Sequence, residues 1–148
     1  MVLIAVSAFM YGLFPKSSWN KEVDLDSDNI KVMLCTSTYT PNQDTHQYKS
    51  SVTNEVTGTG YVAGGNTLAS TVVTYTAGTN TVSFDAADTV WAGSTITARY
   101  AVVYDSTPGT DATRPLICYV DFGADVVSSG GNFTIAWDAL GIISVTVA

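Results

Sequence analysis

The sequence predicts an all-β protein, a single antiparallel β-sandwich or barrel-like domain with at most one short N-terminal helix. Apolar and polar residues alternate with a period of two in several segments, most clearly in "STITARYAVVY", residues 94–104. Clusters of Gly, Pro, Asn, Asp and Ser separate these segments, as is typical of turns between short strands. The 148 residues contain no linker or break in composition, so we expect one β domain over residues 1–148.

The first ten residues, "MVLIAVSAFM", form an apolar segment that we expect to be a strand. The segment has no basic flank, and no small-residue cleavage site follows it, so the pattern does not favour a targeting signal. It is also shorter than the roughly 20 residues that a membrane helix needs. We therefore expect residues 1–10 to belong to the fold or to a subunit contact. A short helix is predicted near residues 11–22, where Pro15 fits only the first turn.

The remaining strands follow from the same alternation. Residues 32–35 are apolar on both faces, as in a central strand. A tight hairpin is predicted around Gly78 and Asn80. The further strands are expected within residues 71–76, 81–84, 94–104, 116–122, 132–138 and 142–147.

The charge balance excludes several classes of function. The chain has thirteen acidic and six basic residues, a formal net charge of −7 and a pI near 4.2. Nucleic-acid binding depends on many cationic contacts to phosphates, and anionic membranes also attract cations. We therefore expect no nucleic-acid and no membrane partner.

A glycine-rich stretch, "EVTGTGYVAGGNTL" at residues 55–68, raises the question of a cofactor loop. A phosphate-binding loop presents backbone N–H groups at the start of a helix, but β-type sequence follows here. The glycines are better suited to tight turns or bulges. We expect no cofactor.

The chemically reactive residues form no recognisable constellation. Acidic residues occupy alternate positions from Glu22 to Asp28, but the spacing lacks the Gly and Glu that an EF-hand loop requires, and a calcium site of another geometry stays open. His46 is the only histidine and has Asp44 nearby, but no nucleophile elbow accompanies them. We expect no catalytic and no metal-binding residue, so the protein is not predicted to be an enzyme.

The two cysteines, Cys35 and Cys118, lie in apolar runs without a second ligand at metal-binding spacing. This pattern favours free buried thiols, and a disulfide between the two stays open.

The aromatic residues divide into two groups. Tyr100, Tyr104, Phe133 and Trp137 fall on apolar strand faces and are expected in the core. Three tyrosines fall near predicted loops and are candidates for contacts with a protein or a sugar: Tyr39, Tyr48 and Tyr61.

Several motifs together resemble a family of small structural proteins of tailed phages. The resemblance lies in an acidic lead-in to a strand, the "YTPNQDTH" loop, the "GTGYVAGG" turn and the "VDFG" strand, and it covers roughly Tyr11 to the C-terminus. The strongly apolar first ten residues depart from the family pattern. The resemblance implies a virion component on the capsid surface, most commonly a head decoration (cement) protein, with the major capsid protein as partner. It brings no catalytic residues.

An apolar N-terminal strand without an evident partner would be covered by pairing with another subunit. We therefore expect a homo-oligomer, trimer first and dimer second. The candidate subunit contacts are Val2, Leu3, Ile4, Val6 and Phe9. Two alternatives stay open: a receptor- or carbohydrate-binding module of a tail or head fibre that uses the loop tyrosines, and, less favoured, a hydrolase that uses His46 and an acid.

Overall fold

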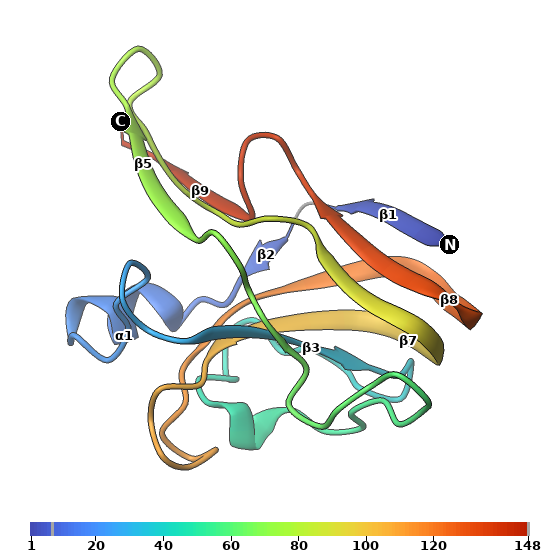
Figure 1. Cartoon of the computed structure of the whole chain (residues 1–148). Helices are drawn as coiled ribbons and strands as arrows, with labels where there is room; N and C mark the ends of the chain where they lie inside the picture. The colour runs from blue at the N-terminus through green and yellow to red at the C-terminus, as the bar shows by residue number, and fades with distance from the viewer. Residues whose placement is uncertain (7, 148) are drawn as a thin grey trace.

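The computed structural model describes residues 1–6 and 8–147. The chain is an all-β, sandwich-like domain with one short α-helix in this range, as the sequence predicts (Figure 1). Its elements, in chain order, are β1 (Val2–Val6), β2 (Phe9–Met10), α1 (Phe14–Trp19), β3 (Ile30–Cys35), the 3-10 helix η1 (Lys49–Ser51), β4 (Asn66–Thr67), β5 (Val72–Thr76), β6 (Thr81–Asp85), β7 (Thr89–Asp105), β8 (Leu116–Trp137) and β9 (Ile143–Thr146).

The long antiparallel hairpin of β7 and β8 is the frame of the domain. Its ladder shifts register between Trp91 and Ser94, and close to this point Gly93 and Gly130 adopt φ angles of +57° and +69°. Both strands turn back together there, at the right of Figure 1. The start of β7 and the end of β8 consequently lie over the rest of the same hairpin. One continuous ladder thereby supplies both layers of the sandwich.

Shorter strands extend this frame on both sides. The main sheet has the strand order β1-β8-β7-β3-β4, and β2 also pairs with β8. A second sheet has the order β5-β6-β9. All pairs are antiparallel except β1 with β8, which is parallel. The antiparallel prediction therefore holds for every pair but this one.

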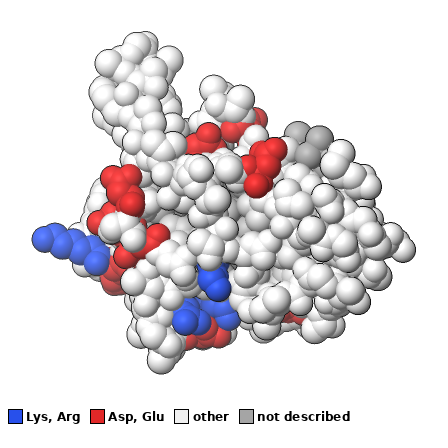
Figure 2. Space-filling view, in the orientation of Figure 1, with Lys and Arg blue, Asp and Glu red and all other residues white. Residues whose placement is uncertain are grey.

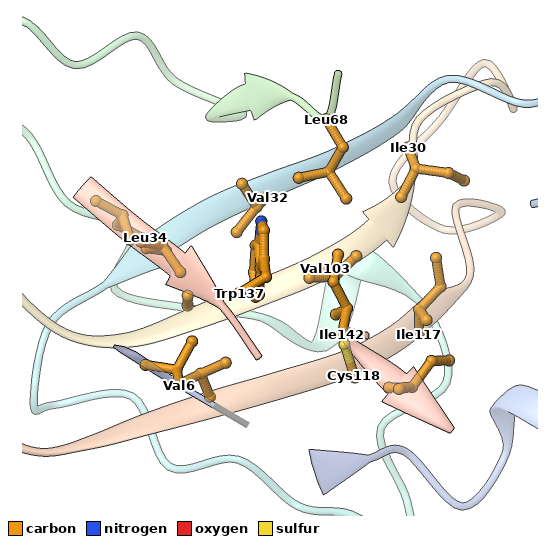
Figure 3. Close-up of a cluster of buried hydrophobic side chains, with 14 of the residues drawn as sticks. Val6, Ile30, Val32, Leu34, Leu68, Val103, Ile117, Cys118, Trp137 and Ile142 are labelled. Carbon is orange, nitrogen blue, oxygen red and sulfur yellow. The ribbon is translucent and has the colours of Figure 1, made fainter. Parts of the chain in front are cut away.

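The main core fills the space between the two layers of the bent hairpin. Ile30, Val32 and Leu34 of β3 face Val6 and Trp137 of the opposite layer in Figure 3. Every one of these side chains is buried. Because the apolar side chains of both layers meet here, burial of this surface is the main term that stabilises the fold.

The opposite face of β3 is buried as well. Met33 and Cys35 pack there in a second cluster with Tyr11, Tyr39 and Tyr104. The loop after β3 covers this face, which explains why residues 32–35 are apolar on both sides. The prediction of a central strand is confirmed.

The N-terminal segment differs from the prediction in one respect. It forms two strands that both pair with β8: Val2–Val6 lie beside Phe133–Trp137, and Phe9–Met10 lie beside Cys118–Tyr119. The expectation that this segment lacks a partner within its own chain is wrong, because the bent β8 offers it a free edge at both ends. The outer edge of β1 ends the main sheet.

Other local predictions can be compared directly. The helix begins at Phe14 with Pro15 in its first turn, and the hairpin of β5 and β6 turns at residues 77–80, so both predictions are confirmed. The strands expected at 116–122 and 132–138 are parts of one strand, β8. The glycines near residue 130 bend this strand and do not end it.

We expect the double variant Gly93→Ala/Gly130→Ala to lower the free energy of unfolding by about 2 kcal/mol, because each alanine would hold a left-handed conformation. An added Cβ meets no atom within 4 Å at either site, so the effect isolates the backbone. The control is Gly78→Ala/Gly109→Ala, where space is also open and φ is not positive, and it should change stability by less than about 0.5 kcal/mol. Chemical denaturation measures both. Equal losses in the two variants would contradict the role of the bend.

Candidate functional site

The most unusual surface of the molecule is the three-stranded sheet of β5, β6 and β9, which we call the arm. Its β5–β6 turn projects beyond the rest of the chain at the upper left of Figure 1. Direct cross-strand pairs place Val73 opposite Phe84, Tyr75 opposite Val82, and Val82 opposite Val145. Since opposite residues share a face, these side chains line one side of the arm.

This apolar face changes from buried to exposed along its length. At the base of the arm, Phe84 and Ile143 are buried in the main core. Toward the tip, the same face leaves a set of apolar side chains between 37% and 58% exposed: Val73, Tyr75, Val82, Val145 and Val147. Complete burial of one such side chain is worth about 1.5–3 kcal/mol, so a substantial part of this stabilisation is unrealised in the isolated chain.

The opposite face of the arm is polar apart from Val72. Its other residues are threonines, serines and Asp85, which lies opposite Val72 at the base. The hydroxyls of Thr81 and Thr146 hydrogen-bond across this face at 3.1 Å. An antiparallel sheet with one apolar and one polar face normally packs the apolar face on a core. The outer half of the arm has no such core within the described chain.

Charge is nearly absent from the arm: Asp85, at the base of β6, is its one charged residue. Residues 71–84 and 139–148 contain no Asp, Glu, Lys or Arg. In Figure 2 the arm is white, and the coloured residues gather at its base and over the lower left of the body. An exposed apolar strip without charges is typical of a protein-contact surface.

The predicted N-terminal contact residues lie in different environments. Val6 is buried in the core and Ile4 packs against it, so these two residues stabilise the monomer. Val2 is half-buried beside Phe133, and Phe9 is 54% exposed with its ring stacked on Tyr119. Leu3 pairs through its backbone with Thr134, and its side chain lies outside the described part of the structure. The exposed Phe9 is the strongest remaining contact residue of this set.

The loop tyrosines are less accessible than the sequence indicates. Tyr39 is 1% exposed, because its loop folds onto β3, so its prediction as a surface contact is wrong. Tyr61 is half-buried; its ring stacks on Trp91, and its hydroxyl donates to Glu55 at 2.7 Å. Tyr48 is half-buried and donates to Glu22 at 3.1 Å. All three tyrosine side chains therefore make contacts within the domain.

The glycine-rich segment turns the chain, as its sequence predicts. Gly60, Gly64 and Gly65 have positive φ angles, and Gly65 lies against the backbone of Val32 and Met33 with no room for a Cβ. Glu55 accepts hydrogen bonds from Tyr61 and from the Gly64 amide. These contacts fix the turn to β3.

A polar hollow of about 400 Å³ lies beside this turn. Three of the six basic residues line it, namely Lys31, Lys49 and Arg114. The carboxylate of Asp111 accepts from both Lys49 and Arg114 at 2.8 Å, and Lys49 also lies over the ring of Tyr104. These ion pairs join the loop between β7 and β8 to η1, so the hollow has an evident structural role.

His46 belongs to a hydrogen-bonded chain and has no acidic partner within it. Its Nδ1 accepts from the Asn42 amide at 3.4 Å and lies 3.1 Å from the Tyr39 hydroxyl, which in turn lies 2.9 Å from the Tyr11 hydroxyl. Burial lowers the pKa of His46, which favours the neutral ring. The Asp44 backbone instead bonds the side chain of Asn42. This arrangement stabilises the loop and contains no base-orienting carboxylate.

The acidic run also has local partners. The side chain of Asp24 accepts from the Asp26 amide, and that of Asp28 accepts from the Asp24 amide at 2.7 Å. Among the described residues, no three His, Cys, Asp or Glu side chains gather as metal ligands would. The carboxylates shape the turn that precedes β3.

Asp105, at the end of β7, is a buried acid that no sequence pattern singles out. Burial and then the nearby carboxyl of Asp28 raise its pKa to about 6. Its Oδ1 accepts from the Thr107 amide at 2.8 Å, and its Oδ2 is buried without a donor in the described part of the chain. A charged Asp105 is therefore destabilising at neutral pH.

The two cysteines are free and buried, as the sequence favours. Burial is the main cause that raises the pKa of both thiols. A buried thiol with a raised pKa is a poor nucleophile at neutral pH.

No helix in the described range is long and apolar enough to cross a bilayer. Comparisons of the chain with protein-family models, with curated proteins and with solved structures found no match. The arm is therefore the candidate functional site on its own physical features.

We expect His46→Ala to fold and to lose about 1 kcal/mol of stability, because it removes the hydrogen bonds to Asn42 and Tyr39. The pKa of folded His46 lies below its ordinary value of 6.5. The wild-type contribution is thus present above that value and declines as the pH falls below it. Denaturation at about pH 7.5 and about pH 5 should show a smaller difference between the two proteins at the lower pH. A difference that grows at low pH would contradict this assignment.

We expect Asp105→Asn to raise stability at pH 7 by about 1–2 kcal/mol, because it removes a buried charge and keeps the acceptor for Thr107. The pKa of folded Asp105 is raised above 3.8, so the wild type gains protons and stability as the pH falls through about 6. The advantage of the variant should therefore shrink toward pH 4. Thermal melts of both proteins across this range provide the measurement, and a variant that is less stable at pH 7 would contradict the account.

Proposed function

We propose that this protein is a bacteriophage virion component, a capsid decoration (cement) protein that stabilises the head through protein–protein contacts. The observation that carries the proposal is the exposed apolar face of the arm, which lacks charge over its whole length. Burial of this face against another protein would remove apolar surface from water and stabilise the complex of the two. The sequence resemblance to small tailed-phage structural proteins supports the same role.

The proposed partners are the major capsid protein and further copies of this chain, with a trimer favoured over a dimer, on the surface of the virion. Nucleic acid and membrane are not proposed as partners, and no catalytic step is proposed. An acidic, rigid β domain suits attachment to the outside of a shell, where it needs only stable surfaces. The alternative, a carbohydrate- or receptor-binding module, relied on exposed loop tyrosines, and Tyr39 is buried.

We expect purified protein to bind shells that lack it and to raise their melting temperature. A variant of the arm, Tyr75→Ser/Val82→Thr, should bind at least tenfold more weakly, because it removes apolar surface that the bound state buries. Thr74→Ser/Ser83→Thr changes the polar face of the same two strands and should bind as the wild type does. Cosedimentation with shells measures binding, and quantitative mass spectrometry of intact virions gives the copy number.

The expected copy number is comparable to that of the major capsid protein. A few copies per particle, together with binding to glycans and none to shells, would contradict the proposal and favour the fibre module.

A further inference from the structure

The apolar face of the arm continues into a groove on the body of the same molecule. This groove, which we call the N-terminal groove, has a volume of about 360 Å³ and lies between β2 and the segment that leads into β9. Phe9, Met10, Leu140 and Ile143 provide its apolar walls. Leu140 is 80% exposed and Phe9 is 54% exposed, so the walls are open to a partner.

Ile143 connects the two surfaces. It lines the groove, and it lies on the same side of β9 as Val145 and Val147 of the apolar face. The arm and the groove thus meet at Ile143, and together they give the molecule an apolar projection next to a partly apolar depression. Such a surface can be self-complementary, because the projection of one copy can enter the depression of another.

The tip of the arm does not reach the groove of its own chain. Hydrogen bonds fix the arm as a three-stranded sheet, including Val147 to Asn80 at 2.8 Å, and Figure 1 shows its turn directed away from the body. Only another molecule can cover the tip.

The charge distribution favours a second copy as that molecule. Each copy has a net charge of −7, so the repulsion between two copies is smallest when they meet through surfaces without charged residues. The arm has no charged residue beyond Asp85 at its base, and residues 8–10, which supply one wall of the groove, are uncharged. Asp138 is the charged residue at the groove, and its carboxylate accepts from the Leu140 amide at 2.8 Å. An arm docked in a groove therefore brings few like charges together.

We propose that the tip of the arm of one copy docks in the N-terminal groove of a second copy, through Tyr75, Val82 and Val145 of the first and Phe9 and Leu140 of the second. This inference rests on the proposed function: it names a second copy of the same chain as the protein that covers the arm. The contact is reciprocal in a dimer or repeats around a closed ring in a trimer.

The test uses two variants that each remove one half of the contact. Tyr75→Ser/Val145→Thr alters the arm, and Leu140→Glu places a charge in the groove at a largely exposed position. The control is Thr74→Ser/Ser83→Thr, on the polar face of β5 and β6 and outside the groove lining. Thermal melts verify folding, and light scattering after size exclusion measures the mass at several concentrations.

We expect wild type and control to have the mass of a dimer or trimer, and each variant to associate at least tenfold more weakly. A mixture of the two variants should form a complex of two chains. The arm of the Leu140→Glu variant is intact and can dock in the intact groove of the arm variant. A monomeric wild type would overturn the inference, as would an arm variant with unchanged mass or a mixture that stays monomeric.

The outcomes separate this inference from the proposed function. If the wild type is monomeric and still binds shells, the inference fails and the decoration role stands. If the expected complexes form and none binds shells, the inference stands and the decoration role fails.

Discussion

The bend in the β7–β8 hairpin is the constraint on which the rest of the structure depends. A straight hairpin of this length would expose both faces, whereas the bent one encloses a core between its own halves. Gly93 and Gly130 provide the left-handed conformations that the bend requires. The bend also brings both ends of β8 within reach of residues 2–10, which explains how so short a segment pairs with both of them. The N-terminal strands then close one side of the core.

The same geometry explains why the arm is exposed. The core between the two layers has room for the base of β6 and β9, where Phe84 and Ile143 are buried. The strands continue past the edge of the body, and their apolar alternation continues with them. The arm is thus well ordered by its hydrogen bonds and incomplete in its packing. This combination is what an assembly element requires, because a rigid sheet loses little conformational entropy when a partner covers it.

The sequence predicts the local elements well and their long-range arrangement poorly. The alternation in residues 94–104 identifies a strand because a period of two is a local property. The parallel pairing of Val2–Val6 with Phe133–Trp137 joins segments from near opposite ends of the sequence and depends on the bend at Gly93 and Gly130, so no local pattern encodes it. The burial of Tyr39 also depends on the long-range arrangement of the chain. Its neighbours predict a loop correctly, but only the fold of that loop over β3 determines that the side chain is buried. For the arm, alternation predicts the hairpin, but the same pattern would result whether the apolar face were covered or exposed.

The central claim is that the apolar face of the arm is covered in the working protein. Hydrogen–deuterium exchange of the protein at high and at low concentration tests it directly, because association slows exchange only where amides become protected. The account predicts that slower exchange at high concentration is confined to β5, β9 and the groove segments 8–10 and 138–144. Unchanged exchange in these segments, or protection that arises instead around the polar hollow and η1, would contradict it.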